Sequence, residues 1–164
     1  MAGDRIREIE WPTIGLIAIT YLVVMALVWF HASLPWWLIL PVGAYFAALH
    51  TSLQHEVLHG HPTGNRLLND AMVYPALTLW LPYHRYRQTH LTHHNDSNLT
   101  DPRLDPESYY MLPEHWADVT GLRRVLYEFN HTLAGRMLIG PAISIIRFWT
   151  SEFRNIAKLS LIHI

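Results

Sequence analysis

Cysteine is absent from the sequence. Disulfides, thiolate metal ligands and thiol nucleophiles are therefore excluded, and a transition-metal site in this chain has to be built from imidazole, with carboxylate at most. Histidine, in contrast, is plentiful, because the 164 residues include 12 of them. Seven fall between residues 55 and 94, so the capacity to bind a metal is concentrated in one segment.

Charged side chains are also scarce. Asp, Glu, Lys and Arg make up 15% of the residues, against roughly 25% in soluble domains, while 51% of the residues are hydrophobic. The formal net charge is -1, so the chain lacks the basic excess of nucleic-acid-binding proteins and no nucleic-acid partner is expected. The seven Trp and eight Tyr are of the kind that collects at membrane interfaces.

Two long uncharged runs predict helices that cross a membrane. Residues 13–30 and 36–53 contain no Asp, Glu, Lys or Arg, and each is about as long as a transmembrane helix. The first run is longer than the apolar core of a signal peptide, and no cleavage site follows it. Because only a short turn joins the runs, we expect an all-α, integral-membrane helical hairpin whose two outer ends lie on the same side.

Arginine placement predicts which side that is. Arg5 and Arg7 precede the first run, Arg66, Arg85 and Arg87 follow the second, and the turn between the runs has no Lys or Arg. The positive-inside rule places both outer ends, and the histidine-bearing helices after them, in the cytoplasm. The lack of fused domains and retention signals favours a multi-pass protein of a bacterial inner membrane.

The next apolar segment, residues 71–83, is too short to span. As a helix it would reach about 20 Å, against about 30 Å of hydrocarbon, and Pro75 and Pro82 interrupt it. We therefore expect an interfacial or re-entrant segment that returns the chain to the side it left. Further along, residues 119–132 are predicted to form an amphipathic helix.

The clustered histidines have helical spacing. His55 and His59 are four residues apart, so one helix presents both on one face. His90, His93 and His94 fall within about a third of the circumference of a second helix. Because the chain returns to the same side, we expect His55 and His90 to meet and the two patches to face each other across a metal-sized gap.

Three further histidines lie near these clusters. His61 and His84 are off the helical faces of the clusters and are additional candidate metal ligands. His50 lies inside the second apolar run, where we expect a helix-packing role, although polar groups within membrane helices are often functional.

One competing motif overlaps the first cluster. The segment His55-Glu56-Val57-Leu58-His59 fits the His-Glu-x-x-His pattern of zinc metalloproteases, in which the glutamate is the general base. A membrane zinc metalloprotease is therefore an alternative. No third histidine follows at the metzincin spacing, and a single zinc takes about three protein ligands, which leaves the cluster at residues 90–94 unexplained.

The paired clusters resemble the first two histidine boxes of the membrane fatty acid desaturase superfamily. The residues are His55-x-x-x-His59 and, after a hydrophobic hairpin, His90-x-x-His93-His94. The segment from Tyr86 to Asn95 and the following Thr100-Asp101-Pro102 and Asp105-Pro106-Glu107 also resemble bacterial members. The resemblance covers roughly residues 13–110.

The resemblance implies an enzyme with two non-haem iron ions and O2 as co-substrate. It implies an oxygen-dependent acyl-lipid desaturase that introduces a C=C bond into an acyl chain, held in a membrane lipid or on an acyl carrier. A hydroxylase or ketolase of the same superfamily is an alternative with the same metal site. The electron donor would be external, of the ferredoxin, rubredoxin or cytochrome b5 type. The ligands implied are His55, His59, His90, His93 and His94.

Carboxylates near the boxes have two readings. Glu56, Asp96, Asp101 and Asp105 are candidates for orienting the ligand imidazoles through hydrogen bonds. Glu56 is otherwise a solvated carboxylate at a helix end, and Asp96, Asp101 and Asp105 otherwise form turns.

The chain departs from the superfamily in lacking a third histidine box and in being about half the usual length. His131 and His163 stand alone. We therefore expect residues 1–164 to form a single, partial desaturase-like domain, a truncated product that is inactive by itself.

Overall fold

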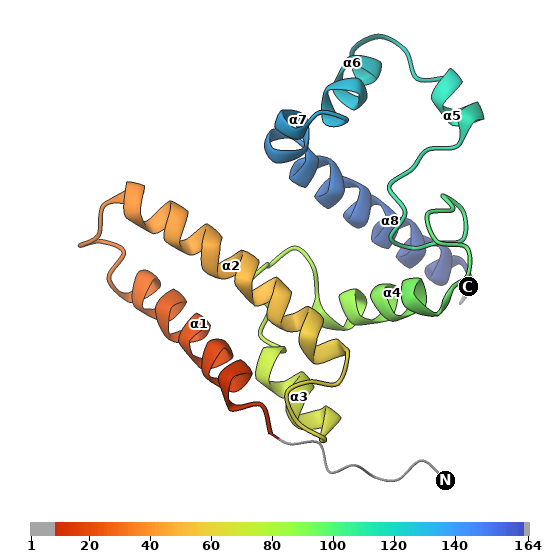
Figure 1. Ribbon diagram of the computed structural model, residues 1–164. Coiled ribbons are helices and arrows are strands. Elements are labelled where there is room, and N and C mark those ends of the chain that lie inside the picture. The colour runs from red at the N-terminus through yellow and green to blue at the C-terminus, as the bar shows by residue number, and fades with distance from the viewer. Residues whose placement is uncertain (1–8, 163–164) are drawn as a thin grey trace, which may run out of the picture. The chain divides into compact units, whose positions relative to one another are not determined.

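The chain folds entirely into helices. The computed structural model describes residues 9–162, and within that range it contains eight α-helices and no strand (Figure 1). The predicted all-α class is therefore confirmed. The chain divides into two compact units, and the boundary lies between Ser108 and Tyr109. The helices are α1 Trp11–Trp29, α2 Trp36–Leu58, α3 Arg66–Val73, α4 Tyr83–Asn95, α5 Pro113–Ala117, α6 Gly121–Asn130, α7 Leu133–Leu138 and α8 Gly140–Ile162.

The first unit begins with the predicted hairpin. Helices α1 and α2 pack side by side with a short turn between them (Figure 1). Their most apolar 18-residue windows have mean hydropathies of 2.1 and 1.2, and only 11% of each window is buried. Apolar side chains such as Leu22 and Leu40 therefore face outward, as lipid-facing residues do. Arg5 and Arg7, on which part of the topology prediction rests, lie outside the described residues.

Helix α2 continues past the apolar run that predicted it. The run ends at Leu53, whereas the helix ends at Leu58, because no breaker comes before Gly60. Gly60 has φ +94°, a left-handed conformation that suits glycine at the end of a helix. The extension carries His55 in its last turn and His59 as its C-cap.

A buried amide closes the loop that follows α2. Asn69 is 1% exposed, and its Oδ1 accepts hydrogen bonds from the backbone N–H and the hydroxyl of Thr63, at 3.1 and 2.6 Å. Its Nδ2 donates to the carbonyl of Thr63 at 2.9 Å. The Asn65 side chain caps α3 by accepting from Leu68 N–H at 3.2 Å. Polar groups buried in the loop are thus satisfied, as burial requires.

The expected re-entrant segment is only partly helical. Helix α3 ends at Val73, and residues 74–82 form a non-helical connection, since Pro75 has no N–H to continue the helix. The hairpin holds this connection through two side chains. Gln54 Nε2 donates to the carbonyl of Val73 at 3.1 Å, and the Tyr21 hydroxyl donates to the carbonyl of Pro75 at 2.9 Å.

A small apolar core joins the four helices of the first unit. It consists of Ile17, Leu53, Val57, Val73 and Tyr83, from α1, α2, α3 and α4. The ring of Tyr83 is buried, and its hydroxyl donates to Asp70 Oδ1 at 2.7 Å. This core fixes the start of α4 beside the end of α2, which brings the two histidine segments together.

The second unit contains α5 to α8. Helix α6 has Leu122, Val125, Leu126 and Phe129 along one face, so the amphipathic helix predicted at residues 119–132 is confirmed. Gly135 allows α6 and α7 to approach, because a Cβ at that position would lie 1.9 Å from the carbonyl oxygen of Phe129. Among the described residues, only α1 and α2 are long and apolar enough to cross a membrane.

Candidate metal centre

The end of α2 presents the first histidine pair. His55 and His59 are one helical turn apart, and their ring centroids lie 4.7 Å apart. Both rings remain accessible, since the His55 side chain is 40% exposed and His59 is also exposed. The i, i+4 spacing therefore places two imidazoles at one open end of the helix.

Helix α4 presents the second pair. The Nε2 atoms of His90 and His94 lie 2.9 Å apart. His90 is largely buried, with 11% of its side chain exposed, whereas His94 is exposed. The two nitrogens therefore lie close enough together to bind one ion.

The two pairs face each other. Ring centroids are 4.8 Å apart for His55 and His90 and again 4.8 Å apart for His59 and His94. The predicted meeting of His55 and His90 is therefore found. One ligand nitrogen from each of these four histidines can be chosen so that all four lie within 4.8 Å of one another.

This arrangement fits a metal ion. With a metal–imidazole distance of about 2.1 Å, ligands on opposite sides of an ion are about 4.2 Å apart and ligands at right angles about 3.0 Å apart. The 2.9 Å between the Nε2 atoms of His90 and His94 matches the distance between two ligands at right angles. The ligand nitrogens of the group of four are at most 4.8 Å apart, which exceeds the distance between ligands on opposite sides of an ion by less than about 1 Å. An all-imidazole donor set suits iron or zinc.

His93 lies outside the group of four. Its Nδ1 lies 2.9 and 3.0 Å from the carboxylate oxygens of Asp105. A similar contact holds His90, whose Nδ1 lies 3.1 and 3.0 Å from the carboxylate oxygens of Glu107. Both carboxylates belong to the loop that follows α4.

The pKa of Asp105 reflects opposing effects of burial and hydrogen bonding. Burial by itself raises the pKa of this carboxyl, but hydrogen bonds from the backbone N–H groups of Thr100 and Glu107 and from His93 outweigh burial. The net result is a pKa below its ordinary value. Asp105 is therefore a carboxylate at neutral pH and accepts, rather than donates, in all three contacts.

His59 favours its neutral form. Desolvation lowers the pKa of this imidazole, and the neighbouring rings of His55, His94 and His90 lower it further. The neutral imidazole is the form that binds metals, so the crowding of the four rings keeps a ligand form available.

The two additional candidates are held elsewhere. His61 Nδ1 is paired with the carboxylate of Glu10, which ties the start of α1 to the loop after α2. The His84 ring lies against Tyr74 and Tyr83, with centroid distances of 5.5 and 6.3 Å. Neither histidine is part of the group of four.

Three of the four carboxylates proposed from sequence lie as follows. Glu56 is 56% exposed, and its Oε1 lies 3.7 Å from His55 Nδ1, beyond hydrogen-bonding distance. Asp96 accepts from the backbone and side chain of Asn98, at 2.8 Å each. Asp101 accepts from the N–H groups of Arg103 and Leu104. The two aspartates thus form turns.

His50 packs within the hairpin. It is fully buried on α2, and its Nε2 lies 2.8 Å from the hydroxyl oxygen of Tyr21 on α1. This contact agrees with the helix-packing role expected from sequence.

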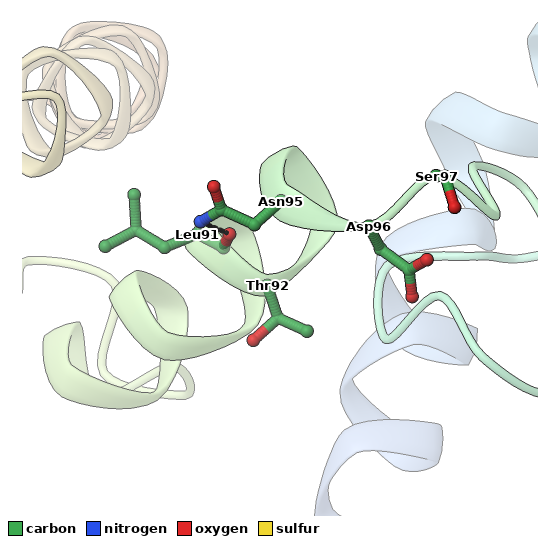
Figure 2. A pocket seen from close by; sticks show the side chains of 5 residues that line it. All are labelled: Leu91, Thr92, Asn95, Asp96 and Ser97. Carbon is green, nitrogen blue, oxygen red and sulfur yellow. Dashed lines mark hydrogen bonds between the residues drawn. The ribbon is translucent and has the colours of Figure 1, made fainter.

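The opposite face of α4 carries no histidine of the group. A shallow hollow of about 430 Å³ is lined there by Leu91, Thr92, Asn95, Asp96 and Ser97 (Figure 2). Its side chains offer hydroxyl, amide and carboxylate groups but no imidazole, so none of the histidines of α4 lines this hollow.

A family model named fatty acid desaturase matches residues 31–160. The chain belongs to the fatty acid desaturase family. No curated protein and no solved structure matches the chain. Membership of this membrane family, together with the exposed apolar faces of α1 and α2, identifies the desaturase as a membrane protein with transmembrane helices. It also favours a desaturase-type function over the zinc metalloprotease alternative.

The sequence did not indicate Glu107 as a functional candidate. For Asp105 it left two roles open, orienting an imidazole or forming a turn. The contacts of both residues depend on how the loop folds back onto α4, and no helical periodicity links positions 12 and 17 residues apart. The nearest signal in the sequence is the acidic segment 105–107 after the second box, which resembles desaturases.

Proposed function

We propose that this protein is an oxygen-dependent di-iron desaturase that introduces a C=C bond into an acyl chain. The observation that carries the proposal is the group formed by His55, His59, His90 and His94, which converge from two helices in a member of the fatty acid desaturase family. Two non-haem irons would supply activation of O2 and removal of hydrogen from an unactivated C–H bond.

Each histidine has a defined part in this proposal. His55, His59, His90 and His94 hold one ion through neutral imidazole nitrogens. His93, beside them on α4 and 5.7 Å from His94 between ring centroids, is left for the second ion. His61 and His84 are excluded from the ligand set, because their rings contact Glu10 and two tyrosines instead.

The position of the site suits a lipid substrate. The group of four lies at the end of α2, directly after the segment that crosses the bilayer. An acyl chain in the membrane can therefore approach the site along the apolar faces of the hairpin. The acyl chain belongs to a membrane lipid or an acyl carrier, and electrons come from a separate ferredoxin-, rubredoxin- or cytochrome b5-type protein.

We further propose a cytoplasmic position for the site, in a bacterial inner membrane. Arg66, Arg85 and Arg87 flank the histidines, which agrees with the positive-inside rule. Within residues 9–162, the group of four and His93 complete the ligand set of only one ion, so we expect this chain to be inactive by itself as a desaturase.

Iron loading and product analysis test these statements separately. The purified chain, reconstituted anaerobically with Fe(II), should bind about one ion per chain, with imidazole ligands recognised by their multiple scattering in X-ray absorption. Binding of zinc in preference to iron, with hydrolysis of a peptide, would overturn the desaturase proposal. For the desaturase reaction, mass spectrometry of lipids from cells expressing the complete enzyme should show loss of two hydrogens. Gain of oxygen would establish the hydroxylase or ketolase alternative instead.

A further inference from the structure

Two histidines of α4 are backed by carboxylates from the loop that follows the helix. Glu107 contacts Nδ1 of His90, and Asp105 contacts Nδ1 of His93, at 2.9 to 3.1 Å. A carboxylate can only accept, so each imidazole donates its Nδ1–H. Nε2 of each ring then carries the lone pair that binds a metal.

For His90 the two ring nitrogens face opposite partners. Nδ1 faces Glu107, and Nε2 is the atom 2.9 Å from His94 Nε2 within the group of four. The hydrogen bond therefore holds the ring in the orientation that places its lone pair among the other ligand nitrogens.

Asp105 is itself held in place. Its side chain is 1% exposed, and its two oxygens accept from the backbone N–H groups of Thr100 and Glu107, both at 2.9 Å. Glu107 thus donates to Asp105 through its backbone while its side chain reaches His90. The two contacts are linked through one residue, and the loop folds as a unit against α4.

A purely structural role accounts for Asp105 but not for Glu107. Asp105 organises a turn in the same way as Asp101, which accepts two backbone N–H groups and contacts no histidine. The Glu107 carboxylate, in contrast, has no hydrogen-bonding partner except His90 among the described residues, and it is 28% exposed. A carboxylate that serves only His90 points to a role in the site.

We propose that Glu107 and Asp105 are positioning residues, which fix His90 and His93 as Nδ1–H tautomers with Nε2 available to a metal. The metal part of this inference rests on the proposed function. Carboxylates that accept from a ligating imidazole also make it a better donor, and their loss typically costs about 10–100-fold in metal affinity.

Cobalt(II) binding to the full chain tests the metal part. Glu107→Ala should weaken cobalt affinity by about 10–100-fold. Glu107→Gln should retain part of it, since the amide oxygen still accepts from Nδ1–H. Glu128→Gln, which alters a glutamate paired with Arg124 rather than with a histidine, is the matched control and should bind cobalt as the unaltered chain does. Asp105→Asn should also bind weakly, but the Glu107 variants decide the matter because Glu107 makes no side-chain contact to the loop backbone.

Nitrogen-15 NMR of the metal-free protein tests the tautomers directly. His90 should give Nδ1–H signals in the unaltered chain and a mixture of tautomers in Glu107→Ala. Unchanged cobalt affinity together with an unchanged tautomer in Glu107→Ala would overturn the proposal. If the unaltered chain binds no cobalt or iron, the proposed function fails, and the tautomer spectra alone then decide whether the carboxylates fix the rings.

Discussion

His90 and His94, one turn apart on α4, bring their Nε2 atoms to 2.9 Å from each other. Two imidazole nitrogens so close share either one proton or one metal ion. His94→Ala removes one of four ligands and should weaken binding of Fe(II) or Co(II) by at least the roughly 10–100-fold that follows loss of an outer contact. Calorimetric titration of the purified chain measures this, and His84→Ala should bind as tightly as the unaltered chain.

Glu56 separates the iron site from the zinc-protease alternative. In the protease motif this glutamate is the general base, and its loss abolishes activity. Here it is 56% exposed and 3.7 Å from the nearest imidazole nitrogen, so Glu56→Gln should leave the metal content unchanged. Elemental analysis after reconstitution checks this. Peptide hydrolysis then separates the two alternatives, because Glu56→Gln would abolish hydrolysis by a protease without removing its zinc. A variant that loses its metal would assign Glu56 a place in the site that its present contacts do not provide.

The elements predicted well are those governed by short periodicities. The apolar runs 13–30 and 36–53 became α1 and most of α2, and the i, i+4 spacing of His55 and His59 placed both rings on one side of α2. The path of residues 74–82 depends on Gln54 and Tyr21, which bind carbonyls distant in sequence. The contact between Glu107 and His90 also joins residues distant in sequence, so no short periodicity could predict it.

The orienting roles of Asp96 and Asp101 stay predictions without supporting contacts. Their side chains accept from N–H groups two or three residues further along the chain, which is the ordinary turn chemistry of aspartate. Sequence proximity to the second box made them equal candidates with Asp105. Only the fold of residues 96–108 distinguishes them, because it buries Asp105 against His93.

The buried amide of Asn69 should stabilise the loop that follows α2, because it is hydrogen-bonded to Thr63. Asn69→Ala leaves the buried N–H and carbonyl of Thr63 without their partner, which should lower the free energy of unfolding by about 1–3 kcal/mol. Unfolding in mixed detergent micelles, followed by circular dichroism, measures the change. Asn95→Ala removes one hydrogen bond at an exposed site and should change it by less than about 0.5 kcal/mol. Equal effects of the two variants would contradict this assignment.

In the second unit, Tyr109 should ionise before Tyr110. The Tyr109 hydroxyl donates to the Tyr110 hydroxyl at 3.4 Å. The hydrogen bond between the two hydroxyls lowers the pKa of Tyr109, as does Arg136. The same pair raises the pKa of Tyr110. As pH rises toward 10, the Tyr109 signal should therefore shift first in a carbon-13 NMR titration. Tyr110→Phe should raise the pKa of Tyr109, whereas Tyr127→Phe should leave it unchanged.

The absence of cysteine makes the membrane topology directly measurable. Ser33 lies exposed in the turn between α1 and α2, and Ser97 lies exposed in the loop after α4. If Arg66, Arg85 and Arg87 hold the histidine side in the cytoplasm, Ser33→Cys should react with an impermeant maleimide in intact bacterial spheroplasts. Ser97→Cys should react only after the membrane is permeabilised. The cysteine-free chain is the control and should stay unlabelled in both cases. The reverse labelling pattern would place the histidines outside the cytoplasm, away from soluble cytoplasmic electron donors, and would remove the basis for an external ferredoxin or rubredoxin partner.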